Sequence, residues 1–355
     1  MSVYKCRLLD AMPKAGELAM AELVLVTGGT GFIAGWTIVK LIEHGYRVRT
    51  TVRDRGREAA LRAAVASQTG DTDGLSFAIA DLTDDDGWVA AVGGCNHVLH
   101  IASPLGRDAP RDRDALVEPA RGGTLRVLKA AVAAGVDRVV MTSAAATARG
   151  RDTNVISNEN VWADSEDPLL DPYRRSKILA ERAAWDFMAA AGGKTTLTTL
   201  LPGGVFGPLL PGGTPGSVWI VQNMLAGKPP RLINLGISIV DVRDLASAHV
   251  AALTAPQAPG ERFLCTGEFL WMADIARILR DGLGADGARV PTKVLPDYLV
   301  YLLSLFMPQL RMFRHDIGQR RDADNTKARG ILGFDSRPSC VTLLECARSL
   351  LEARH

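Results

Sequence analysis

Apolar residues follow two different spacings along the first two hundred positions of the chain. Short runs rich in Val, Leu and Ile predict strands, and segments with helical spacing lie between them. Most of the predicted strands lack polar alternation, which is typical of a parallel sheet covered on both faces. The pattern predicts an α/β fold, a doubly wound parallel sheet that binds ligands beyond the carboxyl ends of its strands. The predicted strands are 22–27, 46–53, 75–80, 96–102, 136–142 and 195–201, and the helices are 31–44, 57–67, 84–93, 115–134 and 172–192.

Residues 24–34, VLVTGGTGFIA, join the first strand to the first helix through a glycine turn. A strand, a tight glycine turn and a helix start form a cradle for a nucleotide pyrophosphate, as in Rossmann domains. Gly28 lets the chain turn sharply, and Gly31 lacks a side chain that would keep a phosphate from the backbone. Glycine makes up 35 of 355 residues, so this spacing alone also fits a strand–turn–helix unit without a ligand.

Composition narrows the class of protein. Hydrophobic residues make up 47% and charged residues 23%, which is typical of a globular enzyme, and the net charge of +2 argues against a nucleic-acid or membrane-surface protein. The five cysteines are scattered without a CxxC pair and the six histidines do not cluster, so we expect no metal site and a cytoplasmic protein with reduced thiols. The longest apolar segment, 298–307, is about half of the ~20 residues that cross a bilayer.

The pattern changes after Pro202. Residues 202–216 hold six glycines and four prolines and predict a long loop, whereas 239–254 predict a short strand followed by an amphipathic helix. We expect a Rossmann domain at 20–201 plus about 236–255, a smaller substrate-binding lobe at about 202–235 plus 256–355, and a poorly ordered extension at 1–19. Within the lobe the sequence predicts a strand near 262–266, helices at 272–283 and 339–353, and an apolar segment at 297–313.

Tyr173 and Lys177 form a candidate catalytic pair in the segment YRRSK. Asp171 and Pro172 mark the start of a helix, and a spacing of four residues places the two side chains on one face of it. We expect the ammonium group to favour the phenolate and to lower the pKa of Tyr173 from its usual value of about 10. The pair can then transfer a proton, although a surface tyrosine beside a solvated lysine would have the same spacing.

The ends of the next strands carry candidate cofactor contacts. Arg53 ends the second strand, where an arginine suits a ribose 2′-phosphate and favours NADP over NAD, although Asp54 follows it. Asp81, followed by Leu82, ends the third strand and would accept a bond from the adenine amino group or cap the next helix. The small residues of HIASP at 100–104 allow a flat cofactor to approach the backbone, or simply pack closely.

Together these segments resemble the extended short-chain dehydrogenase/reductase family, part of the NAD-dependent epimerase/dehydratase superfamily. The chain is most similar to its dihydroflavonol-reductase-like branch, which includes cinnamoyl-CoA reductases, anthocyanidin reductases and microbial aldehyde or carbonyl reductases. The matching segments follow the family's order over about residues 20–350. They are VTGGTGFIA at 26–34, TVRD at 51–54, HIASP at 100–104, GGTLRVLKAA at 122–131, RVVMTSA at 138–144, YRRSK at 173–177, LPGGVFGP at 201–208 and DVRDLASAHV at 241–250.

The resemblance implies an NADP-dependent oxidoreductase that reduces an aldehyde, ketone or flavonoid-like carbonyl of a small-molecule substrate with NADPH. Hydride would come from the nicotinamide, Tyr173 would donate the proton, and Lys177 would hold the ribose hydroxyls. The segment from Pro202 to Val205 would contact the nicotinamide amide. The cofactor-binding residues implied are Thr27, Gly28, Gly31, Phe32, Ile33, Arg53, Asp81, Leu82, Ile101, Ala102, Ser103, Thr142, Tyr173, Lys177, Pro202, Gly203 and Val205.

One departure concerns the third catalytic residue. The family has TSS after the fifth strand, and its second serine polarises the carbonyl, but this chain has Thr142-Ser143-Ala144. Either Ser143 substitutes through a shifted loop, or it only bonds within the protein and the site has one donor fewer. The loss of one such donor can cost about 10²–10³ in rate.

The substrate pocket is expected to lie among 145–170, 203–235 and 297–320. Its candidate aromatic residues, each of which also fits a core position, are Trp162, Phe206, Trp219 and Tyr298. A basic run, formed by Arg311, Arg314, Arg320 and Arg321, is either a solvated face or a site for an acidic substrate such as a CoA thioester.

Two other functions stay open at this point. The first is a nucleotide-sugar epimerase or dehydratase, or a 3β-hydroxysteroid-type dehydrogenase, against which Arg53 argues because it does not favour NAD. The second is a non-catalytic NADP(H)-sensing protein, which Ala144 favours and the intact Tyr173–Lys177 pair opposes. We expect a monomer or homodimer.

Overall fold

The structure is a computed structural model that describes residues 21–104, 112–150, 152, 155–168, 170–212, 216–307, 310, 313–314 and 316–353. The extension expected at 1–19 lies outside the described residues. No helix in these ranges combines the length and the apolar character that crossing a membrane would require.

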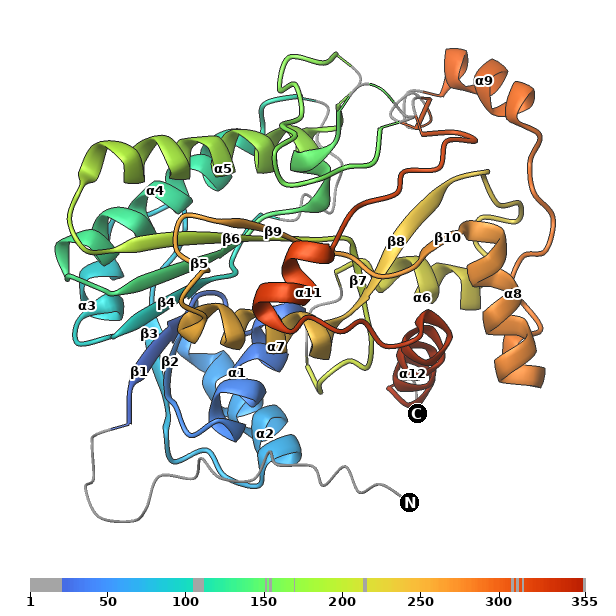
Figure 1. Cartoon of the computed structure of the whole chain (residues 1–355). Helices are drawn as coiled ribbons and strands as arrows, with labels where there is room; N and C mark the ends of the chain where they lie inside the picture. Colours follow the sequence, from blue (N-terminus) through green and yellow to red (C-terminus); the bar gives the residue numbers. More distant parts are fainter. Residues whose placement is uncertain are drawn as a thin grey trace, which may run out of the picture.

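A seven-stranded parallel sheet forms the centre of the molecule, in the order β3-β2-β1-β4-β5-β6-β9 (Figure 1). The order reverses direction between β1 and β4, and ligands of doubly wound sheets bind at such a point. The six strands predicted from the sequence are all present, and the predicted fold is confirmed. The strands are β1 (Leu23–Val26), β2 (Arg47–Val52), β3 (Leu75–Ile79), β4 (His97–His100), β5 (Arg138–Thr142), β6 (Thr196–Pro202) and β9 (Arg262–Cys265).

Helices cover both faces of this sheet, as its apolar strands require (Figure 1). On one face α1 (Phe32–Glu43), α2 (Glu58–Thr69) and α7 (Val242–Thr254) share a core that continues into the smaller lobe. On the other face α3 (Trp88–Val92), α4 (Val117–Ala133) and α5 (Pro172–Ala191) enclose a second core. The helix expected at 84–93 begins later, after Gly87, whose backbone φ of 85° is left-handed.

The smaller lobe contains a three-stranded sheet in the order β10-β8-β7, flanked by helices at the far end of the molecule (Figure 1). Three expectations are corrected here. Gly236–Asp241, expected in the Rossmann domain, forms β8 of this small sheet. The loop predicted at 202–216 contains β7, because Gly204–Phe206 pairs with β8. Arg262–Cys265, expected in the lobe, forms β9 and pairs with β6 in the large sheet. The other elements are β7 (Gly204–Phe206), β8 (Gly236–Asp241), β10 (Phe269–Trp271), α6 (Trp219–Leu225), α8 (Met272–Leu283), α9 (Asp297–Phe306), α11 (Thr326–Leu332), α12 (Ser339–Glu352), and the 3-10 turns η1 (Arg55–Arg57), η2 (Ala145–Ala148) and η3 (Gly284–Gly287).

Candidate active site

A cleft of about 750 Å³ opens at the carboxyl ends of the parallel strands and runs from the glycine turn to the start of α5. This volume is within the usual range for cofactor and ligand sites. Among the predicted site residues, all except Thr27 line this cleft, although they come from distant parts of the chain. They are Gly28, Gly31, Phe32, Ile33, Arg53, Asp81, Leu82, Ile101, Ala102, Ser103, Thr142, Ser143, Tyr173, Lys177, Pro202, Gly203 and Val205.

The glycine turn brings the start of α1 to the cleft. Gly28 has a φ of 72°, and a Cβ atom there would lie 2.9 Å from the Cβ of Ala102, so a side chain would force the two segments apart. The α1 N-terminus at Gly31 has no side-chain cap, and Phe32 and Ile33 of its first turn line the cleft. Backbone N–H groups and the positive end of the helix dipole are therefore available to an anion.

Thr27 acts behind the cleft wall and does not line it. Its hydroxyl oxygen accepts bonds from the backbone N–H groups of Ile101 (3.0 Å) and Ala102 (2.9 Å). Its proton is therefore directed to Nδ1 of the buried His100, 3.0 Å away, and the other ring nitrogen of His100 donates to Thr124. Thr27 is thus the one predicted site residue that does not line the cleft, and its hydroxyl holds the segment after β4 in position.

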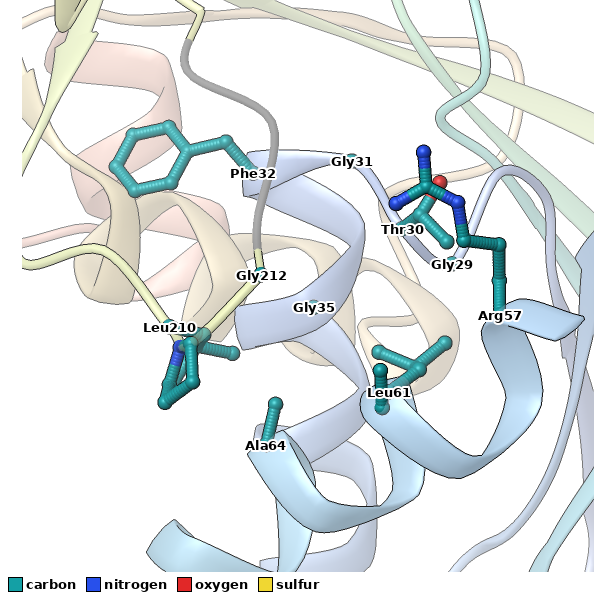
Figure 2. Close-up of a pocket in the computed structure, with 12 residues that line it drawn as sticks. Gly29, Thr30, Gly31, Phe32, Gly35, Arg57, Leu61, Ala64, Leu210 and Gly212 are labelled. Atoms are coloured by element: carbon teal, nitrogen blue, oxygen red, sulfur yellow. The ribbon is translucent and has the colours of Figure 1, made fainter. Parts of the chain in front are cut away.

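Two arginines lie at one end of the cleft. Arg53 and Arg57 are both exposed and both line it. Figure 2 shows the Arg57 side chain reaching from the start of α2 toward Thr30 and the glycine turn, beside a smaller pocket of about 30 Å³. The carboxylate of Asp54 accepts a bond from the Gly56 N–H (2.9 Å) and caps η1. Asp54 therefore has a local role in the turn, and the sequence analysis missed Arg57.

Asp81 lines the cleft and also accepts hydrogen bonds from a neighbour in the chain. One carboxylate oxygen accepts bonds from the Thr83 N–H (2.8 Å) and hydroxyl (2.7 Å). These bonds lower the pKa of Asp81 and keep it charged. The Asp81 side chain therefore stabilises the turn from Asp81 to Thr83. It does not cap α3, because that helix begins only at Trp88.

Tyr173, Lys177 and Glu181 lie on one face of α5, each four residues from the next. The helix starts where the sequence predicts, because Asp171 accepts a bond from the Arg174 N–H (2.9 Å) and Pro172 follows. Lys177 is buried, and its ammonium donates to the Thr142 carbonyl at 3.0 Å. Lys177 therefore reaches the end of β5, and Tyr173 lies one turn earlier on the same face of the helix.

The pKa of Tyr173 departs from the expected direction. Burial, followed by the negative charge of Asp171, raises the pKa of this phenol to about 12. Burial also lowers the pKa of Lys177 to about 8. The expected lowering of the Tyr173 pKa is thus wrong for the free protein, because desolvation of the phenolate prevails. The phenol holds its proton at neutral pH and is in the state that a proton donor needs.

Ser143 is turned toward the protein interior. Its hydroxyl donates to Oε2 of Glu181 at 2.6 Å, while Oε1 accepts from Thr199 (2.8 Å) and from Nε of Arg262 (2.9 Å). A serine hydroxyl has one proton to donate, so in this conformation Ser143 does not polarise a carbonyl. The idea that it replaces the missing serine through a shifted loop is not supported by this geometry. Ala144 also lines the cleft without a donor in its side chain.

The four candidate aromatic residues lie elsewhere. Phe206 is a core residue, and Trp219 and Tyr298 are 55% and 73% exposed. The ring of Trp162 stacks under Arg262, whose guanidinium carbon lies 3.7 Å from the ring centroid. Of the expected pocket segments, 145–170 and 203–235 contribute to the cleft wall, with Ala145, Ala146, Gly216 and Ser217 among their residues, whereas 297–320 does not within the described ranges.

The predicted basic run does not act as one patch. Arg320 forms an ion pair with Asp322 (2.8 Å), and Arg321 lies 3.6 Å from Asp316. Arg314 lies over the ring of Tyr301, and Arg311 is outside the described residues. No group of three or more His, Cys, Asp or Glu side chains that could hold a metal was found in the described part of the chain.

Comparison with known proteins agrees with this geometry. The sequence model of the NAD dependent epimerase/dehydratase family matches residues 24–265, from β1 through β9. The chain belongs to this family. The resemblance to its dihydroflavonol-reductase-like members is also confirmed, because curated relatives include cinnamoyl-CoA, anthocyanidin and dihydroflavonol reductases.

Two sequence relatives and one solved structure illustrate the similarity. The chain is 32% identical to cinnamoyl-CoA reductase 1 of Petunia hybrida over 343 residues, covering 94% of this chain and 93% of that protein. It is 32% identical to anthocyanidin reductase of Arabidopsis thaliana over 272 residues, which are 72% of this chain and 78% of that protein. The crystal structure of yeast methylglyoxal/isovaleraldehyde reductase Gre2 complexed with NADPH matches with a TM-score of 0.76 and 25% identity, covering 94% of this chain and 99% of that chain.

Proposed function

We propose that this family member is an NADPH-dependent reductase of an aldehyde, ketone or flavonoid-like carbonyl. The observation that carries the proposal is that one cleft is lined by the glycine turn, by Arg53 and Arg57, and by the Tyr173–Lys177 pair. Similarity to cinnamoyl-CoA reductase 1, to anthocyanidin reductase and to the NADPH-bound methylglyoxal/isovaleraldehyde reductase Gre2 supports the same reaction type. NADPH, when bound, supplies a hydride to the carbonyl carbon.

The residues of this chain would bind the cofactor and donate the proton. The uncapped start of α1 would hold the pyrophosphate through the N–H groups of its first turn. Lys177 would orient the ribose through its ammonium group, which the Thr142 carbonyl already fixes at 3.0 Å. Tyr173, whose high pKa keeps it protonated, would donate its proton to the carbonyl oxygen as negative charge develops there.

The purified full-length chain should oxidise NADPH when given a suitable carbonyl compound. A panel of aliphatic aldehydes, cinnamaldehyde, a dihydroflavonol and cinnamoyl-CoA would be tested by the loss of NADPH absorbance. Protein that carries bound NAD⁺ and oxidises NADPH with no member of the panel would favour an epimerase or dehydratase instead. Protein that binds NADPH and turns over nothing would favour the sensing function.

Arg57→Ala should raise the KM for NADPH about tenfold and leave the KM for NADH nearly unchanged, because only NADPH carries the 2′-phosphate that Arg53 and Arg57 would pair with. The matched control is Arg55→Ala. Arg55 lies in the same turn, but its side chain is 80% exposed and pairs with Glu58 at 3.7 Å. Equal changes in the KM values for NADPH and NADH, or an equal effect of the control, would contradict this assignment.

A further inference from the structure

A cluster of charged side chains lies where the smaller lobe meets the start of α5. It comprises Arg149 after η2, Asp171 and Arg174 at the start of α5, and Asp316 and Arg321 from the C-terminal part of the chain. Two members, Arg149 and Arg174, line the cleft together with Tyr173. The family matches and the proposed reaction leave this cluster without a role.

The ion pairs within the cluster leave one more arginine than aspartate. Arg174 bonds to Asp316 at 2.6 Å and lies 3.1 Å from Asp171, so both carboxylates are engaged by its guanidinium. Arg321 lies 3.6 Å from Asp316 and donates to the carbonyl of Gly150 at 3.3 Å. Three arginines therefore face two aspartates, and the cluster has a net charge of +1.

Arg149 is the member of this cluster without a bonded partner among the described residues. Among the residues that the structure describes, none forms a hydrogen bond with its side chain or an ion pair within 4.0 Å. Burial and the neighbouring arginines lower its pKa to about 10, so the guanidinium remains charged at neutral pH. The carboxylates of Asp316 and Asp171 act on this guanidinium only from a distance, since both are bonded to Arg174. A partly buried cation without a hydrogen-bonded anion is unfavourable, and an anion in the cleft would relieve this cost.

We propose that Arg149 binds a carboxylate group of the carbonyl substrate. This inference rests on the proposed reductase function and adds the chemical class of its substrate. A guanidinium presents parallel N–H donors that match the two oxygens of a carboxylate. We assign the anion to the substrate because Arg149 lines the cleft close to Arg174 and Asp171, which flank Tyr173 in the chain. The cofactor phosphates would instead bind at the α1 start and at Arg53.

The test compares matched substrates that differ only in charge. With NADPH, the wild-type protein should show a higher kcat/KM for 4-carboxybenzaldehyde and for succinic semialdehyde than for their methyl esters. Arg149→Met should lower kcat/KM for the acids about 10- to 100-fold and leave the esters within about twofold, the range for hydrogen bonds to charged groups. Arg149→Lys should recover part of the loss. Arg320→Met serves as control, because Arg320 is surface-exposed and paired with Asp322.

A thermal-shift measurement separates failure of this inference from failure of the proposed function. With NADP⁺ present, benzoate should raise the Tm of the wild type but not that of Arg149→Met, and benzamide should raise neither. An equal loss of acid and ester reduction in Arg149→Met, or a preference for a phosphorylated aldehyde over both acids, would overturn the carboxylate assignment. If the wild type reduces no carbonyl, the reductase proposal fails, and the benzoate shift still decides whether Arg149 binds a carboxylate.

Discussion

Replacing Tyr173 with Phe should lower kcat for carbonyl reduction by about 10²- to 10⁴-fold, the usual contribution of a positioned general acid. The change removes one hydroxyl from the cleft wall and leaves the ring in place. Within the described ranges this hydroxyl has no hydrogen-bond partner, so its loss leaves no other group unsatisfied. We therefore expect an unchanged Tm and an unchanged Kd for NADPH.

The measurement is steady-state NADPH oxidation with the best carbonyl of the panel, together with a fluorescence titration of NADPH. Tyr46→Phe is the matched control, because Tyr46 is also half-buried but does not line the cleft. Undiminished turnover by Tyr173→Phe would eliminate the proton-donor role. Loss of NADPH binding together with turnover would show that the residue mainly holds the cofactor.

Replacing Arg262 with Met should destabilise the protein by about 3–5 kcal/mol, a large part of the stability of an average domain. Arg262 pairs with Glu181 at 2.9 Å, and both side chains are buried between α5 and β9. The same guanidinium donates to the carbonyls of Glu159 (2.6 Å) and Val161 (2.9 Å). Its removal would leave the buried Glu181 carboxylate without its ion-pair partner and would free the 159–161 segment.

Urea unfolding of the full chain would measure this loss. The control is Arg277→Met, because Arg277 pairs with Asp274 at 3.1 Å while its side chain is 70% exposed, and such pairs contribute about 0–1 kcal/mol. Adding Glu181→Leu to Arg262→Met should restore much of the stability, since no buried charge then remains unpaired. Equal losses of unfolding free energy in Arg262→Met and Arg277→Met would contradict the prediction that the buried ion pair stabilises the protein more than the exposed one.

The Glu181–Arg262 pair also connects the site to the large sheet. Glu181 accepts the Ser143 proton at 2.6 Å, so the same carboxylate sets the direction of the residue that follows β5. We expect Ser143→Ala to affect turnover less than Tyr173→Phe does, because its hydroxyl faces Glu181 and not the cleft.

The sequence predicts the strands of the large sheet up to β6 and most of its helices, and nearly all of the site residues that it predicts line the cleft. The apolar strands, the glycine turn, and the Asp171–Pro172 helix start are local patterns, and each depends on residues close together in the chain. Once these patterns indicate parallel strands, the rule that ligands bind at their carboxyl ends places Arg53, Asp81 and Tyr173 at one edge. Strand β7 was missed because its three residues lie in a segment rich in glycine and proline.

Only the tertiary structure determines which residues distant in sequence bond to one another and how deeply each is buried. The chain order and spacing determine that Tyr173 and Lys177 share a helix face, but the pKa of each depends on how deeply folding buries it. The Ser143 hydroxyl points to Glu181, and the Thr27 hydroxyl is held between His100 and the segment after β4. Among the described residues Arg149 has no bonded carboxylate, because Arg174 and Arg321 engage the neighbouring aspartates. Desolvation and ion pairing act through space, and no local pattern of residues contains them.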